Sequence, residues 1–338
     1  MKYVSGPYTA GKLLADIVAI ENALTTRFLT GGAITDKAEQ TGWNARVLNA
    51  SMGRNMVYFD DQGNPNILVK VDPMNLKELD PTWPNAPHPA FIVGGAVKTL
   101  WVGKYQAVRV GQSSSYRVAT LRGVDPQVYT NFDNALQYSR NSGLHLVTWA
   151  TSALLALRAK QRGFSPRGNS YYGKDYVVNS EVGVPSYTYK SNEIDYIGRV
   201  YTGSGPISWS DDGSPFGIYD LNGNIWEWAA GYRTVDGEIQ IIPDGDAALS
   251  NTDMTAASTE WKAILQDGTL VEPGTADTLK WDATGVNGAG TPRLNTVITS
   301  QSTGSEYGYS LFKNLEAVVT VPALLKQLAI YSVDANIP

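Results

Sequence analysis

The stretch GIYDLNGNIWEW, residues 217–228, decides the fold of this chain. Its Asn222-Gly223 step is a strong signal for a tight turn, and the apolar residues on both sides predict two half-buried strands. Glu227 lies between two tryptophans, and a carboxylate in such surroundings is costly to bury without a partner. We therefore expect Glu227 to accept hydrogen bonds, to meet a cation or to point to solvent.

Two interpretations of this segment stay open. In the first, Glu227 accepts hydrogen bonds from backbone amides of a neighbouring loop and has a structural role. In the second, carbonyl groups of the turn and Glu227 bind a hard cation such as calcium, which prefers oxygen ligands in loops rich in Asp, Asn and Gly. The candidate calcium ligands are Asn222, Gly223, Ile225 and Glu227.

The composition of the chain limits the classes of function. With 338 residues, of which 43% are apolar, the chain is long enough for about two domains and a substantial core. The net charge of −5 argues against binding to nucleic acid. No run of about 18 apolar residues is present that would insert into a membrane. We expect neither nucleic acid nor membrane insertion.

Groups able to catalyse a reaction are scarce. The chain has no cysteine, which excludes thiolate nucleophiles, cysteine-ligated metals and a lipid anchor on cysteine. Of the two histidines, His88 lies in a proline-rich stretch, and we interpret His145 as a core residue before a helix. No phosphate-binding loop, nucleophile elbow or dinucleotide-binding fingerprint occurs. The sequence therefore predicts a protein that is not an enzyme and, calcium apart, has no cofactor.

The first seventy residues predict a helix followed by a hairpin. Apolar residues at helical spacing predict a helix that ends at Gly31-Gly32, and strands are expected at 56–59 and 67–71. The helix packs either on its own domain or in a short bundle around a symmetry axis. Its apolar stripe consists of Leu13, Ile17, Ile20, Leu24 and Phe28.

A cluster of prolines at residues 81–89 cannot be helical and predicts a stiff connector. We therefore expect an N-terminal oligomerisation and attachment domain at 1–88 and a second domain at 89–338. Within the second domain, a cap at Thr130 or Asn131 and a cap at Thr148 predict two helices. Residues 243–310 are polar and predict an ordered insertion.

Tyrosines gather in the irregular region 165–214. Tyrosine among Ser, Gly and Asn is typical of binding loops, because it supplies rigid contact area at low entropic cost. The alternative is that these rings hold irregular loops onto the scaffold. If the region binds a ligand, the candidate contacts are Tyr171, Tyr172, Tyr187, Tyr189 and Trp209.

The 217–228 string closely resembles the hallmark of the formylglycine-generating-enzyme-like branch of the C-type lectin fold. Further strings resemble the variable proteins of diversity-generating retroelements, and together they cover roughly residues 91–338. These strings are LRGVDP at 121–126, NFDNA at 131–135, LHLVT at 144–148, PRGN at 166–169, YGKD at 172–175, GYR at 231–233 and DGEIQ at 236–240.

The resemblance implies an α+β protein in which a C-type lectin-like domain follows a small N-terminal helix-plus-hairpin domain. The scaffold would present loop side chains and bind ligands without chemistry. Arg167 would pin its loop through a carboxylate such as Asp175 or Glu227. The structural motif residues would be Asp220, Asn222, Gly223, Asn224, Trp226, Glu227, Trp228 and Arg167.

Phage members of this group are found at tail tips, often as trimers, where they choose the host receptor. Family members continue past residues 321–325 into the varied positions, whereas this sequence ends at Pro338 without them. We therefore expect that the variable segment lies beyond this chain or that another chain completes the fold.

These features lead us to expect a receptor-binding protein of the phage virion, made in the bacterial cytoplasm. Its partners would be a host surface receptor, protein or glycan, other tail proteins and two further copies in a homotrimer. One alternative is an architectural virion protein that joins neighbouring subunits. The other is an oxidase of the formylglycine-generating type, which the absence of cysteine disfavours.

Overall fold

The computed structural model describes residues 10–113, 115–286, 290–300 and 314–331. The chain is a mixed α+β protein with 25% helix and 24% strand, as expected for the fold class. It divides into two compact units. Unit 1 comprises Met1–Val71, Leu100–His145 and Phe164–Glu227, and unit 2 comprises Asp72–Thr99, Leu146–Gly163 and Trp228–Pro338.

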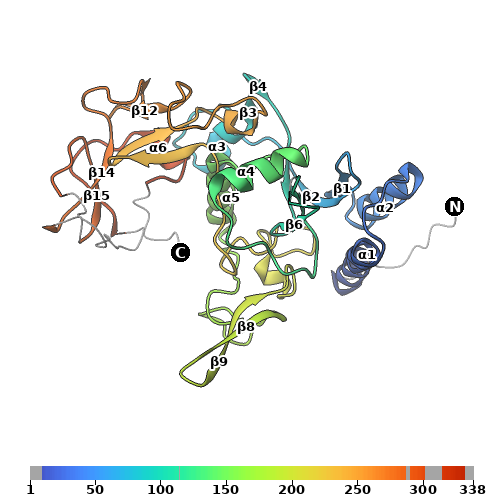
Figure 1. Cartoon of the computed structure of the whole chain (residues 1–338). Coiled ribbons are helices and arrows are strands. Elements are labelled where there is room, and N and C mark those ends of the chain that lie inside the picture. The colour runs from blue at the N-terminus through green and yellow to red at the C-terminus, as the bar shows by residue number, and fades with distance from the viewer. Residues whose placement is uncertain (1–9, 114, 287–289, 301–313, 332–338) are drawn as a thin grey trace. The chain divides into compact units, whose positions relative to one another are not determined.

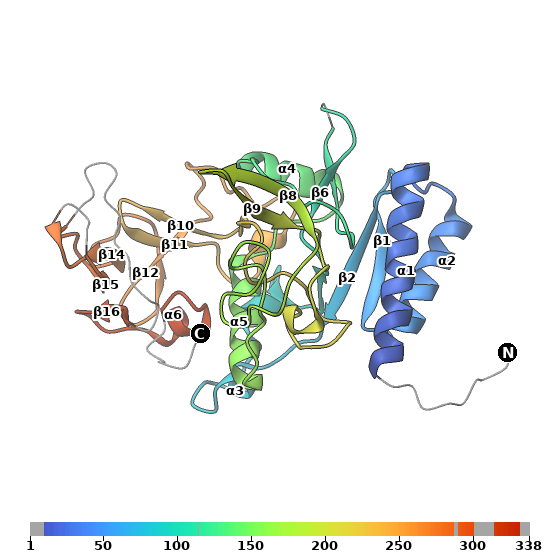
Figure 2. The same ribbon diagram turned by 90° about the horizontal axis from the view of Figure 1, so that it is seen from below.

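Unit 1 begins with two helices and a small sheet. Helices α1 (Ala10–Gly31) and α2 (Lys37–Ala50) lie side by side, and α2 packs on β1 (Figure 2). Strands β1 (Asn55–Phe59), β2 (Pro65–Val71) and β5 (Leu100–Gly103) form an antiparallel sheet in the order β1-β2-β5. The helix and the hairpin predicted from the sequence are therefore confirmed.

The apolar stripe of α1 packs inside unit 1. Ile17, Leu24 and Phe28 belong to the same buried cluster as Ile67 of β2 and Trp209. The stripe therefore serves its own unit, as in the first of the two arrangements expected for it. The side chain of Leu13 lies outside the described residues.

The rest of unit 1 consists of two ribbons, an α-helix and a short 3-10 helix. Of the two caps expected for this helix, Asn131 is the one that caps α4, because its side chain accepts a hydrogen bond from the amide of Asn134. The elements are β6 (Val108–Val110), β7 (Arg117–Ala119), α4 (Phe132–Asn141), β8 (Pro185–Ser191), β9 (Ile194–Val200) and η2 (Ile207–Trp209).

Unit 2 contains helix α5 (Trp149–Arg162) and a seven-stranded sheet. Thr148 caps α5, and Gly163 ends it in a left-handed conformation with φ +63°. The sheet order is β13-β12-β11-β14-β15-β16, with β10 paired to β11. Its strands are β10 (Tyr232–Val235), β11 (Glu238–Ile241), β12 (Lys262–Ile264), β13 (Leu270–Val271), β14 (Lys280–Ala283), β15 (Pro292–Asn295) and β16 (Glu316–Ala317).

The polar tract predicted as an insertion supplies strands β12 to β15 of this sheet, and residues 301–310 of it lie outside the described part of the chain. Short elements complete unit 2. They are α3 (Leu76–Leu79), η1 (Pro89–Phe91), β3 (Ile92–Val93), β4 (Ala96–Val97), η3 (Asp246–Ala248) and α6 (Ala323–Gln327).

The compact units differ from the division expected at residue 88. The proline-rich stretch lies inside the unit 2 segment Asp72–Thr99, and the chain returns to unit 1 at Leu100. The reason is long-range strand pairing, because β2 from the first seventy residues pairs with β5. The N-terminal helices and hairpin are thus built into unit 1.

The two strands expected around Asn222-Gly223 are absent. Residues 217–229 contain no strand, and Tyr219 makes only an isolated bridge with Ser210. Asp220 and Asn224 have positive φ angles of +61° and +64°, which are incompatible with extended backbone. The chain bends at residues 222–225, but the prediction of strands on both sides was wrong.

A buried ion pair joins α1 to the end of β5. The Lys104 ammonium lies 2.7 Å from Glu21 Oε1, and neither side chain is exposed to solvent. The same ammonium donates to Asn55 Oδ1 at 3.0 Å and to the carbonyl of Pro215 at 2.7 Å. The hydroxyl of Tyr105 donates to Glu21 Oε2 at 2.6 Å. Buried charges need this degree of compensation.

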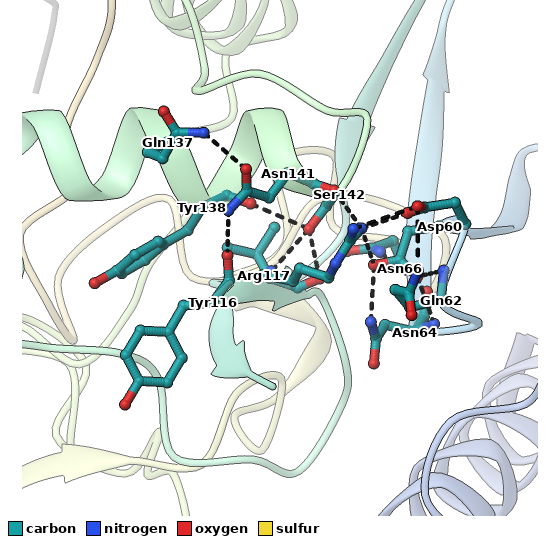
Figure 3. Close-up of polar contacts among 12 residues, drawn as sticks. Asp60, Gln62, Asn64, Asn66, Tyr116, Arg117, Gln137, Tyr138, Asn141 and Ser142 are labelled. Atoms are coloured by element: carbon teal, nitrogen blue, oxygen red, sulfur yellow. Dashed lines mark hydrogen bonds and ion pairs between the residues drawn. The ribbon is translucent and has the colours of Figure 1, made fainter. Parts of the chain in front are cut away.

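A second polar network holds the turn between β1 and β2 (Figure 3). Asp60 is 1% exposed and accepts hydrogen bonds from the backbone amides of Gln62 and Asn64 at 2.9 and 2.8 Å. Its other oxygen accepts from the side chains of Asn64 and Arg117. Arg117 also donates to the carbonyl of Asn141, so the network links the turn to the end of α4.

We predict that Asp60→Ala lowers the free energy of unfolding by about 2–4 kcal/mol, because it leaves buried donors of Asn64 and Arg117 without their acceptor. Urea denaturation measures the loss. Asp61→Ala is the matched control: Asp61 pairs with the same arginine but its side chain is 69% exposed, so the change should stay below about 1 kcal/mol. Equal losses in the two variants would contradict this assignment.

Candidate functional site: an exposed row of tyrosines

Six tyrosines of unit 1 form a continuous row, here called the tyrosine row. Neighbouring ring centroids are separated by 5.6, 4.8, 4.7, 5.6 and 6.3 Å along the row. Separations of this size are those of favourable aromatic pairs. In order, the members are Tyr176, Tyr171, Tyr172, Tyr196, Tyr189 and Tyr187.

The row combines a loop with a hairpin. Tyr171, Tyr172 and Tyr176 come from the loop that follows Asn169, and the other three come from β8 and β9, which form a long two-stranded ribbon (Figure 1). Tyr189 and Tyr196 are direct partners across the ribbon. Five members keep between 38% and 68% of their surface exposed, and only Tyr196 is half-buried.

The structure brings together four of the five residues that the sequence singled out as ligand contacts. Trp209, the fifth, is fully buried in the core of unit 1, and its indole N–H donates to Glu181 Oε2 at 3.2 Å. The prediction for Trp209 was therefore wrong. A large apolar ring in a Ser/Gly-rich stretch has the same sequence signature whether it faces the core or the solvent.

Tyr187 is held by an arginine beneath its ring. The guanidinium carbon of Arg199 lies 4.4 Å from the ring centroid, a cation–π contact. Asp125 fixes Arg199 with two hydrogen bonds of 3.0 and 2.9 Å. Gly198 leaves room for the rings, since a Cβ there would lie 2.8 Å from Tyr187 and 3.3 Å from Tyr189. The ring is thus positioned before any ligand arrives.

The loop bearing the other half of the row is fixed by one buried and two partly buried polar side chains. Asp175 is 3% exposed, and its Oδ1 accepts from the amides of Val177 and Val178. Arg167 forms a bidentate pair with Glu181, with N–O distances of 2.8 and 2.6 Å. Sequence reasoning had offered Asp175 or Glu227 as the partner of Arg167, and the structure corrects this to Glu181. Its pinning role stands.

Asn224 of the 217–228 segment connects both halves of the row. Its Oδ1 accepts from the amide of Val200, the last residue of β9, at 2.9 Å and from the side chain of Asn169 at 3.2 Å. Its Nδ2 donates to Gln106 Oε1 at 2.9 Å. Gly223 lies so close to this loop that a Cβ would be 2.3 Å from the Asn169 carbonyl oxygen. The motif therefore positions the tyrosines.

Glu227 accepts a hydrogen bond from the side chain of Gln106, and burial of its carboxyl raises its pKa to about 7, although the residue as a whole keeps exposed surface. Gln106 also donates to the carbonyls of Asp220 and Gly223, so this buried side chain fixes the backbone of the segment at two points. Trp226 and Trp228, on either side of Glu227, are 101% and 49% exposed.

The calcium site expected at this segment receives no support from the geometry. The carbonyl of Gly223 is engaged by Gln106 and by the amide of Ile225, and Asn222 donates its side-chain amide to Pro166. Within the described ranges, no group of three or more His, Asp or Glu residues is arranged to hold a metal ion. Calcium binding therefore stays a prediction.

The two histidines do not assemble a reactive site. His88 is fully buried; its Nε2 lies 2.8 Å from the Gln327 carbonyl oxygen, and its Nδ1 accepts from the amide of Ala90. Burial lowers the pKa of His88 to about 4, so the ring is neutral at pH 7. His145 is exposed, which corrects its interpretation as a core residue.

Sequence reasoning missed the residues that complete and support the row. Tyr176 and Tyr196 belong to the tyrosine-rich region but were not selected as contacts. Gln106 and Glu181 gave no local signal, because their partners are distant in sequence. Tyr129, which lies outside that region, is 98% exposed with φ +56°.

No protein-family model matches the chain, and no curated protein matches its sequence. The resemblance drawn from the motifs therefore stays a prediction. What the geometry provides is a firm aromatic surface suited to binding, supported by the 217–228 segment.

Asp220 is a buried carboxylate of that segment with incomplete hydrogen bonding. It is 1% exposed; its Oδ2 accepts from the amide of Gly203 at 2.7 Å, whereas its buried Oδ1 has no hydrogen-bond partner. Burial raises the pKa of Asp220 from 3.8 to about 6, with the Gly203 hydrogen bond and the charge of Arg122 opposing the shift.

We predict that this carboxyl makes the protein less stable as the pH rises from about 4 to about 6, because the folded state binds the proton more tightly than the unfolded state. Asp220→Asn should remove this contribution and also tolerate the left-handed backbone. Between pH 4 and pH 6, the difference in free energy of unfolding between the variant and the wild type should change by about 3 kcal/mol in favour of the variant. Parallel stability curves from chemical denaturation would show that the carboxyl does not titrate there.

Proposed function

We propose that this chain is a non-catalytic receptor-binding protein of a phage tail, with a C-type lectin-like scaffold of the kind that retroelements diversify. The tyrosine row supports the proposal most directly. Monomeric proteins do not usually leave a contiguous line of large rings exposed unless the surface meets a partner. Tyrosine suits this purpose, because its ring gives apolar area and its hydroxyl gives hydrogen bonds.

The support beneath the row agrees with a binding role. Arg199, Asp125 and Asn224 hold its two segments in place, so less conformational entropy is lost when a ligand binds. The ligand would be a host surface receptor, protein or glycan, and the chain would act in the virion as a homotrimer with other tail proteins.

Catalysis receives less support than binding. The chain lacks cysteine, and the described residues hold no cluster of metal-binding side chains, so an oxidase of the formylglycine-generating type has no ligands for its metal among them. Within the ranges that the structure covers, no helix has the length and apolar character needed to cross a bilayer.

An architectural role is the second candidate, and one observation favours it. Trp226 is 101% exposed, and a tryptophan so fully in water is typical of a surface that another protein covers. Tyrosine-selective labelling of intact particles separates the two roles. A receptor-binding tip leaves the tyrosine row open to the reagent, whereas an architectural contact that covers the row protects it.

We predict saturable binding of the purified chain to whole bacterial cells in a panel of strains. Tyr172→Ala and Tyr189→Ala should each weaken that binding about tenfold, because each removes a central ring of the row, worth roughly 1.4 kcal/mol of binding free energy. Flow cytometry with labelled protein gives the affinities.

Trp101→Ala is the matched control, since Trp101 is 37% exposed and lies on β5, outside the row. It should bind as the wild type does. Binding to no strain, or equal binding by the row variants and the wild type, would contradict the proposal.

A further inference from the structure

The buried site around Lys104 places an amine against a side-chain amide. Lys104 Nζ lies 3.0 Å from Asn55 Oδ1 and 2.7 Å from Glu21 Oε1. Lys104, Asn55 and Glu21 are each 0% exposed. The three residues come from separate elements, since Asn55 begins β1, Lys104 follows β5, and Glu21 lies on α1.

The side-chain amide of Asn55 is held in one orientation. Its Nδ2 donates to the carbonyl of Phe216 at 2.7 Å, which leaves the carbonyl oxygen turned toward the lysine. The Asn55 backbone is fixed as well, because its amide donates to the Ser51 hydroxyl at 2.9 Å. Holding two reacting groups in one geometry removes much of the entropic part of the barrier.

The surroundings of Lys104 weaken its hold on the proton and exclude water. Tyr105, Trp209, Phe216 and Tyr219 belong to the buried cluster of unit 1. Burial lowers the pKa of Lys104, and the charges of Arg122 and Arg54 act in the same direction against that of Glu21. A lysine with a lowered pKa in an apolar site is a stronger nucleophile than one in water.

We propose that Lys104 and Asn55 form an intramolecular isopeptide bond, with Glu21 as the catalytic residue that transfers protons. Glu21 takes a proton from the ammonium, and the freed Nζ lone pair adds to Cγ of Asn55. Glu21 then relays a proton from Nζ to Nδ2, the Cγ–Nδ2 bond breaks, and Nδ2 leaves as ammonia. The new bond joins Nζ to Cγ.

The reaction balances without an oxidant, a reductant or water. Lysine ammonium, glutamate and asparagine amide become a secondary amide, a protonated Glu21 and free ammonia. Two buried charges disappear in the process, and their desolvation cost disappears with them. The Tyr105 hydroxyl, 2.6 Å from Glu21 Oε2, remains a hydrogen-bond partner for the neutral acid.

The bond would connect the two outer strands of the β1-β2-β5 sheet. It would close the chain between residues 55 and 104 into a covalent loop. The inference is independent of the proposed function, because it concerns a modification inside unit 1 and no ligand.

Mass spectrometry of the purified full chain is the test. The intact mass should be lower than the sequence mass by one molecule of ammonia, and a tryptic digest should contain a branched peptide that joins Lys104 to Asn55. Ammonia loss with linear peptides at both positions would instead indicate a succinimide at Asn222-Gly223 and would overturn the proposal. So would an unchanged intact mass.

Two variants locate the chemistry. Glu21→Gln should retain the full mass and yield no branched peptide, because the amide cannot accept the ammonium proton. Asn66→Ala is the matched control: Asn66 is also 0% exposed, but its side chain bonds to Thr120 and Asn64, so the branched peptide should persist. A branched peptide in Glu21→Gln would show that Glu21 is not needed for the reaction. Absence of the branched peptide in Asn66→Ala would show that the reaction is not specific to the contact between Lys104 and Asn55. The wild-type mass decides the bond itself even if a variant fails to fold.

Discussion

The contact between Lys104 and Glu21 is the constraint on which unit 1 depends. Transferring two charges out of water costs several kcal/mol for each ion, and the contact is tolerated only where every hydrogen-bonding position is filled. Asn55, Pro215 and Tyr105 fill those positions. Since these residues come from separate stretches of sequence, the pair forms only when the N-terminal helix, the small sheet and the 215 loop are all in place.

The same strand end also reaches the surface that we propose for binding. Gln106 lies two residues after Lys104 and bonds to Asn224, which in turn holds Val200 and Asn169. Val200 ends the hairpin, and Asn169 precedes the loop of tyrosines. Hydrogen-bonded side-chain amides therefore connect the core of unit 1 to the exposed aromatic surface. The rings lose little conformational entropy when they bind a ligand, because they are already held in place.

The parts of the fold that could be predicted are those encoded locally. The helices capped by Asn131 and Thr148 follow from side chains that bond amides three residues away. The partner of Arg167 could not be predicted, because Glu181 is one of many carboxylates in the sequence and only the folded loop selects it. The ribbon β8–β9 has exposed residues on both faces, so it lacks the alternation that marks a half-buried strand.

The candidate site shows the same limit. Composition located the tyrosine-rich region but did not separate Trp209, which faces the core, from the rings that face solvent. The strands expected at 217–228 failed because left-handed residues interrupt them, and periodicity does not reveal backbone angles. The proline-rich stretch predicted that the N-terminal segment forms a domain of its own. Because β2 pairs with β5, this segment instead belongs to the same unit as residues 100–145.

The division of the chain into interleaved segments has a consequence for biosynthesis. Unit 1 uses three separate stretches, the last of which ends at Glu227, and two stretches of unit 2 are made before that point. During translation, the early helices and strands therefore cannot complete their packing until segments more than a hundred residues later have been synthesised. Folding of this kind is slow and leaves apolar surface open on the ribosome, so we expect a demand for chaperones and poor tolerance of truncation at either end.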